Sequence, residues 1–261
     1  MLQTTTNTTP NTMENRYQLV DVLNRQGVAR MVEGDFASAI PMFQDGLDIL
    51  ETLRRASFSS PTTVVSSPWQ FRTVSINRDQ EDNSAQQTSF AIFGRCFLLE
   101  PSSSSSSLSS PPPSFYYNKT WQQHLPTIHP TVFQTDSNLF GIVLGYNLAL
   151  AHHIMGNVTR AHHAYQRTIQ VAHHLDVRNN ARVRALALFV ALAVANNMAS
   201  LALTWLDVAT FERYHALTGR LMLVTSTFHA PFFAQNLCFS WKVRERPAPA
   251  AWETHTVWYC A

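Results

Sequence analysis

The chain has 261 residues, of which 45% are hydrophobic and 11% aromatic, and its formal net charge is +2. This length and composition allow one or two domains with an apolar core and argue against a chain disordered throughout. So small a net charge gives no sign of a nucleic-acid partner. Charged residues make up 14% of the chain, well below the roughly 25% of an ordinary soluble domain, so we expect a largely neutral surface.

The three cysteines, Cys96, Cys238 and Cys260, are scattered along the chain and form no CxxC pair. No disulfide framework can be built from them, which favours a reducing compartment. The N-terminal region is rich in Thr and Asn and has no apolar run typical of a secretory signal. We therefore expect a cytoplasmic protein.

Proline and serine divide the chain into helical blocks and polar segments. Ser/Pro tracts cannot bury enough apolar surface to offset the entropy of ordering, so we expect them to be flexible. The predicted parts are a flexible N-terminus (1–14), a helical hairpin (15–56), a low-complexity insertion (57–137), a second helical block (138–228) and a C-terminal tail (229–261).

Two segments of the insertion differ from the rest of it. Residues 67–76 and 88–100 are rich in Phe, Val and Ile with partial alternation, which predicts a β-hairpin or two edge strands. A hairpin standing alone is marginally stable, so the pair should dock on the helices or fray.

The first helical block shows the 3.6-residue period of amphipathic helices on both sides of the turn Gly34-Asp35, where Asp35 is expected to cap the second helix. Two such helices form a hairpin in which neither half can bury its apolar face alone. The stripe of the second helix consists of Ala39, Ile40, Phe43, Leu47, Leu50 and Leu53.

The same spacing of small and aromatic residues recurs 122 residues later. Small residues let two helices approach closely, and the aromatic residue fills the space beneath them. The first set is Leu23, Gly27, Gly34, Ala39 and Phe43; the second is Gly145, Leu148, Ala149, Gly156, Ala161 and Tyr165.

This pattern resembles the tetratricopeptide repeat, in a divergent form. A weaker third copy begins with Asn197-Met198-Ala199, which repeats Asn147-Leu148-Ala149 fifty residues later, but Phe211 and His215 replace its small and aromatic residues. The resemblance implies an all-α solenoid of two to three helical hairpins, interrupted by the long insertion.

Sequence signatures of enzymes and metal sites are missing. There is no GxGxxG, GxxxxGK[ST], GxSxG or HExxH motif. Adjacent histidines point about 100° apart on a helix and cannot chelate one ion as a pair. We therefore expect no catalytic activity, no cofactor and no metal site at the doublets His152-His153, His162-His163 and His173-His174.

The resemblance also implies where a partner binds, because tetratricopeptide-like domains build a concave groove from the first helix of each hairpin. We expect an interaction scaffold or adaptor whose groove holds another protein or a peptide, and no nucleic acid. None of the nine groove positions is Lys or Arg, which argues against the carboxylate-binding groove of that family. The positions are Asn24, Val28, Met31, Tyr146, Leu150, His153, Asn196, Ser200 and Leu203.

Two alternatives stay open. The insertion or the C-terminal segment 231–241 can fill the groove itself, since both are apolar enough. Residues 185–206 carry no charge and are long enough to span a bilayer, which would make the protein membrane-associated. Asn196-Asn197 in the middle of this stretch argue against a span, and a helix apolar all round is equally typical of a solenoid core.

Overall fold

The structure is a computed structural model that describes residues 11–57, 69–76, 90–101, 133–174, 181–225 and 230–245. Within these residues it is mostly helical, which confirms the prediction of a mainly helical chain with a short β-hairpin in the insertion. The helices are α1 (Asn11–Val32), α2 (Phe36–Ser57), α3 (Phe133–Ile154), α4 (Val158–His174), α5 (Ala181–Thr204), α6 (Val208–Val224) and α7 (Ala230–Glu245), and the strands are β1 (Trp69–Ser75) and β2 (Arg95–Pro101).

The element boundaries differ from the predicted ones at several places. Helices α1 and α3 each begin a few residues before the predicted blocks, and α7 lies inside the segment predicted as a tail. Pro231 occupies the first turn of α7, where its missing N–H breaks no helical bond. Most of the Ser/Pro-rich insertion, and the end of the predicted tail, lie outside the described residues.

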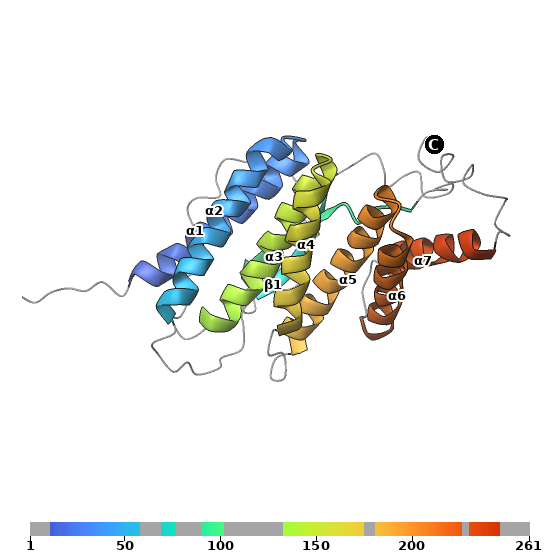
Figure 1. Cartoon of the computed structure of the whole chain (residues 1–261). Coiled ribbons are helices and arrows are strands. Elements are labelled where there is room, and N and C mark those ends of the chain that lie inside the picture. The colour runs from blue at the N-terminus through green and yellow to red at the C-terminus, as the bar shows by residue number, and fades with distance from the viewer. Residues whose placement is uncertain are drawn as a thin grey trace, which may run out of the picture.

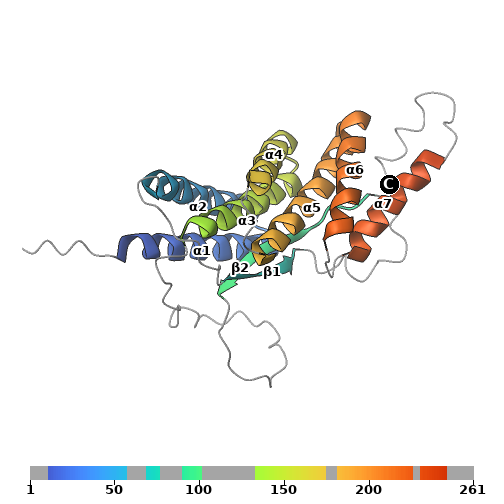
Figure 2. The same ribbon diagram turned by 90° about the horizontal axis from the view of Figure 1, so that it is seen from below.

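The helices form a row in which each packs against the next one along the chain (Figure 1). Helix α3 also contacts both α1 and α5, so the first helices of successive hairpins are neighbours. Figure 2 shows β2 and the stretch before it running along the side of the row formed by α1, α3, α5 and α7. This side is the one on which the insertion returns to the helices.

The turns of the three hairpins share one backbone geometry. Each capping residue donates its N–H to a carbonyl five residues earlier, at 2.8–2.9 Å, and the residue before it has a positive φ, as expected for a helix C-terminus that ends in a left-handed residue. The cap and acceptor pairs are Asp35 and Arg30, Asn157 and His152, and Asp207 and Ala202; the positive-φ residues are Gly34, Gly156 and Leu206.

Close helix approach explains the small residues of the first hairpin. A Cβ added to Gly27 would lie 2.5 Å from the Phe43 ring, so only glycine fits without displacing that ring. In the second hairpin Ala161 and Tyr165 are both fully buried. The third hairpin departs from this packing, because Phe211 and His215 stack on each other with ring centroids 5.3 Å apart.

The two strands pair antiparallel, with Phe97 opposite Thr73. Cys96, Phe97 and Leu99 of β2 are buried against the helices. The described strands therefore dock on the helical row, the first of the two outcomes predicted for them.

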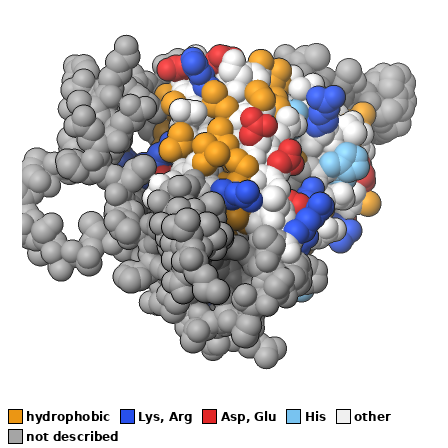
Figure 3. All heavy atoms as spheres, turned by 90° about the vertical axis from the view of Figure 1, so that its left-hand side faces the viewer, with side chains coloured by type: hydrophobic (Ala, Val, Ile, Leu, Met, Phe, Trp, Pro, Cys, Tyr) orange, Lys and Arg blue, Asp and Glu red, His pale blue; other side chains and the backbone are white. Residues whose placement is uncertain are grey.

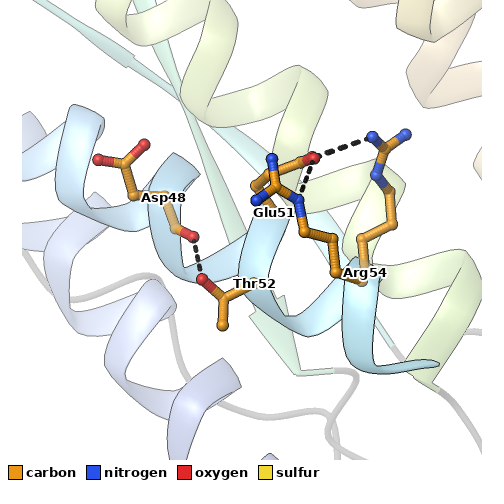
Figure 4. A network of polar contacts seen from close by, with 5 residues as sticks. Asp48, Glu51, Thr52 and Arg54 are labelled. Atoms are coloured by element: carbon orange, nitrogen blue, oxygen red, sulfur yellow. Dashed lines mark hydrogen bonds and ion pairs between the residues drawn. The ribbon is translucent and has the colours of Figure 1, made fainter.

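The outer surface at the α1–α2 end of the row carries both hydrophobic and charged side chains. Hydrophobic side chains gather there among acidic and basic ones (Figure 3), and Leu19 of α1 is 47% exposed. On α2 the Thr52 hydroxyl donates to the Asp48 carbonyl at 2.9 Å, and Arg54 pairs with Glu51 at 3.1 Å (Figure 4). Exposed pairs of this kind contribute only about 0.3–0.5 kcal/mol, so the fold depends on its buried face.

Leu206 provides a test of the shared turn geometry. Its φ of +60° lies in the region that suits glycine, and the equivalent positions are Gly34 and Gly156. Because Leu206 is 59% exposed, Leu206→Gly loses little burial and should raise the free energy of unfolding by about 0.5–1 kcal/mol, measured by urea denaturation. The reverse change, Gly156→Leu, should lower it by about 1–2 kcal/mol; a stabilising effect of that change would contradict the equivalence of the turns.

Candidate peptide-binding face

The segment 90–101 lies against the side of the row formed by α1, α3, α5 and α7. Its side chains Phe93, Phe97 and Leu99 are at most 2% exposed. A segment this deeply buried cannot obtain its backbone hydrogen bonds from water, so β1 must supply them along one edge and the helices along the other.

Three asparagine side chains supply these bonds in pairs. Each accepts a hydrogen bond from the N–H of one residue of the segment and donates one to the C=O of the same residue. Asn147 of α3 pairs in this way with Phe97 (2.9 and 2.9 Å), Asn197 of α5 with Phe93 (2.7 and 3.3 Å), and Asn236 of α7 with Ala91 (3.1 and 2.8 Å).

A second row of side chains reaches the same three carbonyls. Each member lies two helices earlier in the chain than the asparagine, on the first helix of the preceding hairpin, and also accepts a hydrogen bond from this asparagine. Asn24 of α1 donates to the Phe97 carbonyl (3.3 Å), Tyr146 of α3 to that of Phe93 (2.7 Å), and Asn196 of α5 to that of Ala91 (3.1 Å). The bonds from the asparagines are 2.9 Å from Asn147, 3.2 Å from Asn197 and 2.7 Å from Asn236.

We call these six side chains (Asn24, Tyr146, Asn147, Asn196, Asn197 and Asn236) the asparagine face. One rule describes it: the first helices of two consecutive hairpins together bind one residue of the segment. Arg25 extends the rule at the α1 end, because its Nη2 donates to the Leu99 carbonyl at 3.1 Å. Its Nε is held by Asp21 at 2.8 Å.

The asparagine face takes the place of a neighbouring strand. The opposite edge of β2 pairs with β1, and the bond from the Ile76 N–H to the Gly94 carbonyl continues that edge. Successive residues of an extended chain direct their N–H groups to opposite sides, so alternate residues bond to β1 and to the asparagines. These bonds go to the backbone and do not depend on the side chains of the segment.

Aromatic contacts make the packing of the segment depend on its side chains as well. Phe93 stacks on Phe233 with ring centroids 5.1 Å apart and meets Phe189 edge to face at 5.8 Å. Phe97 meets Tyr146 at 4.8 Å and Phe189 at 5.3 Å. Rings from α3, α5 and α7 therefore form the surroundings of two phenylalanines that lie four residues apart.

The nine residues predicted from the sequence all lie on α1, α3 and α5, in three positions of each helix. Asn24, Tyr146 and Asn196 bond to the segment, as described above. Val28, Met31 and Leu150 are buried, with Met31 Sδ 3.5 Å from Cys96 Sγ, while His153, Ser200 and Leu203 are partly buried. The occupant of this face is part of the insertion, one of the two segments considered from the sequence; the other, 231–241, lies in α7 and supplies Asn236.

Sequence reasoning missed Arg25, Asn147, Asn197 and Asn236. Asn147 and Asn197 were noticed only as markers of the repeat. Each follows a predicted groove residue directly in the sequence. The prediction therefore included one residue of each adjacent pair and left out the other.

His153 lines a cavity of about 360 Å³ beside the segment, between Ile92, Ile154, Val158 and Leu201. Burial lowers the pKa of His153 to about 4. The imidazole is therefore neutral at pH 7. The cavity offers apolar contact, a neutral imidazole and the side chain of Thr204.

Two further features bear on the sequence-based alternatives. Among the described residues no group of three or more His, Cys, Asp and Glu side chains is placed to hold a metal ion. Residues Val183–Thr204 are long and apolar enough to cross a membrane, and 78% of the apolar window is buried inside the structure, as in the core helix of a soluble protein. Length and composition alone are weak evidence of a membrane span.

No protein-family model matches the sequence, and comparison with curated proteins and with solved structures finds no significant match.

Asn147 provides the test of the backbone pairing. Asn147→Leu keeps the approximate size but leaves the N–H of Phe97 without its acceptor, so the free energy of unfolding should fall by about 2–4 kcal/mol. Hydrogen exchange at the Phe97 amide should accelerate more than that at the amides of α4. Gln44→Leu on the exposed side of α2 is the control; equal effects of the two changes would contradict the pairing.

His153 predicts how stability depends on pH. The pKa of this imidazole is about 4 in the native protein and near 6.5 when unfolded. Between these values the unfolded chain binds a proton that the native chain excludes. Stability should therefore fall as pH drops from 6.5 toward 4, by about 3 kcal/mol, and stay constant with respect to this group above 6.5.

His153→Gln should reduce the dependence of the free energy of unfolding on pH without removing it, because burial also lowers the pKa values of His152 and His162. Hydrogen bonds also lower the pKa values of the Asp35, Glu51 and Asp207 carboxyl groups. Their contribution to stability is lost only below about pH 5, so the slopes are compared between about pH 5 and 6.5. Exposed His163→Gln is the control, and urea denaturation at several pH values is the measurement. An unchanged slope in His153→Gln would contradict the assignment.

Proposed function

We propose that this chain is a protein-interaction scaffold with a tetratricopeptide-like solenoid, and that it acts by holding an extended peptide on its asparagine face. The observation that carries the proposal is the pairing of Asn147, Asn197 and Asn236 with both backbone groups of one residue each. Such pairing recognises an extended backbone whatever its side chains are, which is the essential feature of peptide recognition by strand addition.

The likeness of the three hairpin turns supports the solenoid part of the proposal. Their backbone hydrogen bonds recur at the spacings of 122 and 50 residues found in the sequence. The first helices of consecutive hairpins contact one another, as stacked repeats require. Helix α7 fits as the first helix of a further unit, since Asn236 bonds to Asn196 as Asn147 bonds to Asn24.

The segment 90–101 occupies the face in the isolated chain, so a partner must replace it. Its tether begins at the end of α2 and ends at the start of α3, and an attached segment competes at an effective concentration in the millimolar range. A partner peptide therefore needs either high affinity or a condition that weakens the attachment of the segment.

Affinity capture with three full-length variants tests the proposal. Phe93→Gly/Phe97→Gly removes the two anchors of the segment and should increase the recovery of partners several-fold over the wild type. Adding Asn147→Ala/Asn197→Ala to that variant should abolish the increase, because the backbone pairing is lost.

Gln44→Ala, an amide removed from the exposed side of α2, is the matched control and should leave recovery unchanged. Circular dichroism checks that each variant remains helical. Equal recovery by all variants would mean that the asparagine face is not the binding site.

A further inference from the structure

We propose that the peptide bound by the asparagine face carries two aromatic residues four positions apart, and that the segment 90–101 is an internal copy of this ligand. The inference rests on the proposed function and adds to it the chemistry of the partner. It follows from two properties of the segment: which N–H groups the face uses, and which side chains it buries.

The hydrogen bonds define where the ligand must keep an N–H group. The N–H groups of Ala91, Phe93 and Phe97 donate to asparagine Oδ1 atoms at 2.7–3.1 Å. Proline has no N–H, so it is excluded at these three ligand positions. The N–H of Ile92 points to the other side of the extended chain and meets none of these asparagines.

The buried side chains define the spacing. Phe93 lies against Phe233 and Phe189, and Phe97 lies against Phe189 and Tyr146. Cys96 is buried as well, against Met31, but belongs to the other alternation of the extended segment. Leu99, two residues after Phe97, adds a third buried position on the same side as the two phenylalanines. Phe93, Phe97 and Leu99 are separated by even numbers of residues, so their side chains lie on the same side of the extended segment. Moving one of them by a single residue would turn it to the other side.

The two recognition elements are coupled. Phe93 and Phe97 are also the residues whose N–H and C=O groups pair with Asn197 and Asn147. A ligand with the wrong aromatic spacing therefore loses the register of its backbone bonds as well as the ring contacts. This coupling makes the face selective although its hydrogen bonds go only to the backbone.

The test uses the full-length Phe93→Gly/Phe97→Gly variant and a fluorescent peptide with the sequence of residues 88–101, in which Cys96→Ala prevents oxidation. Fluorescence anisotropy should show saturable binding to the variant, and at least tenfold weaker binding to the wild type, whose own segment occupies the face. If the variant is unfolded alone, circular dichroism measures whether the peptide restores its helices. Binding or restored folding supports the proposal, and absence of both overturns it.

Three modified peptides test the ligand rules. N-methylation at the position of Phe93 should weaken binding about tenfold or more, whereas the same change at Ile92 should weaken it less than threefold. A peptide with one glycine inserted between Arg95 and Cys96 should bind at least tenfold more weakly than the parent peptide. Equal binding of all three peptides would overturn the inference.

The proposed function and this inference fail in different ways. Partner recovery that depends on Asn147 and Asn197, together with no binding of the 88–101 peptide, would overturn only the ligand chemistry. Partner recovery that ignores both asparagines would overturn the proposed function itself, whatever the peptide does.

Discussion

The structure depends on one constraint: the backbone of the segment 90–101 is buried against helices, and helices have no free backbone groups with which to pair it. A strand normally meets this requirement with a neighbouring strand. Here side-chain amides meet it, because an asparagine carries one acceptor and two donors at the spacing of a peptide group. Aspartate would lack the donor, and leucine would leave the buried N–H of the segment without its acceptor, at a cost of about 1–3 kcal/mol. The rest of the row can be understood as the means of placing Asn147, Asn197 and Asn236 along one side, against Phe97, Phe93 and Ala91 of the segment.

The placement of the three asparagines depends on the hairpins. Close contact within the first two hairpins, such as Gly27 against Phe43, and a turn common to all three position each first helix relative to the next. The asparagine of each helix then reaches the residue held by the preceding helix, so neighbouring hairpins are joined through the segment as well as through their apolar surfaces. Asn197 shows how closely this network is connected, since its Nδ2 atom also lies 3.0 Å from the buried hydroxyl of Tyr165 on α4.

The sequence predicted the helical hairpins, their turns and the two strands of the insertion, because period, capping and small-residue spacing are local signals. Through the repeat it also selected Asn24, Tyr146 and Asn196, which the structure places in contact with the segment. Asn236 could not be predicted, since α7 follows no complete hairpin pattern and its helix was not recognised. Asn147 and Asn197 were visible as a repeated pair, but their role depends on a segment 50 and 104 residues away in the chain. Contacts at such separations have no signature in a single sequence.

The same contacts set the energetic relation between binding and folding. Burying Phe93, Phe97 and Leu99 contributes about 1.5–3 kcal/mol each, which is a large part of the roughly 5–15 kcal/mol that stabilises a typical domain. Releasing the segment would also leave the amides of Asn147, Asn197 and Asn236 without their backbone partners. An empty face is therefore a high-energy state, and the proposed exchange of the segment for a partner would pass through a loosened row of helices. Occupancy of the asparagine face and the stability of α3, α5 and α7 are consequently one coupled equilibrium, so any ligand that binds there in place of the segment must also stabilise the fold.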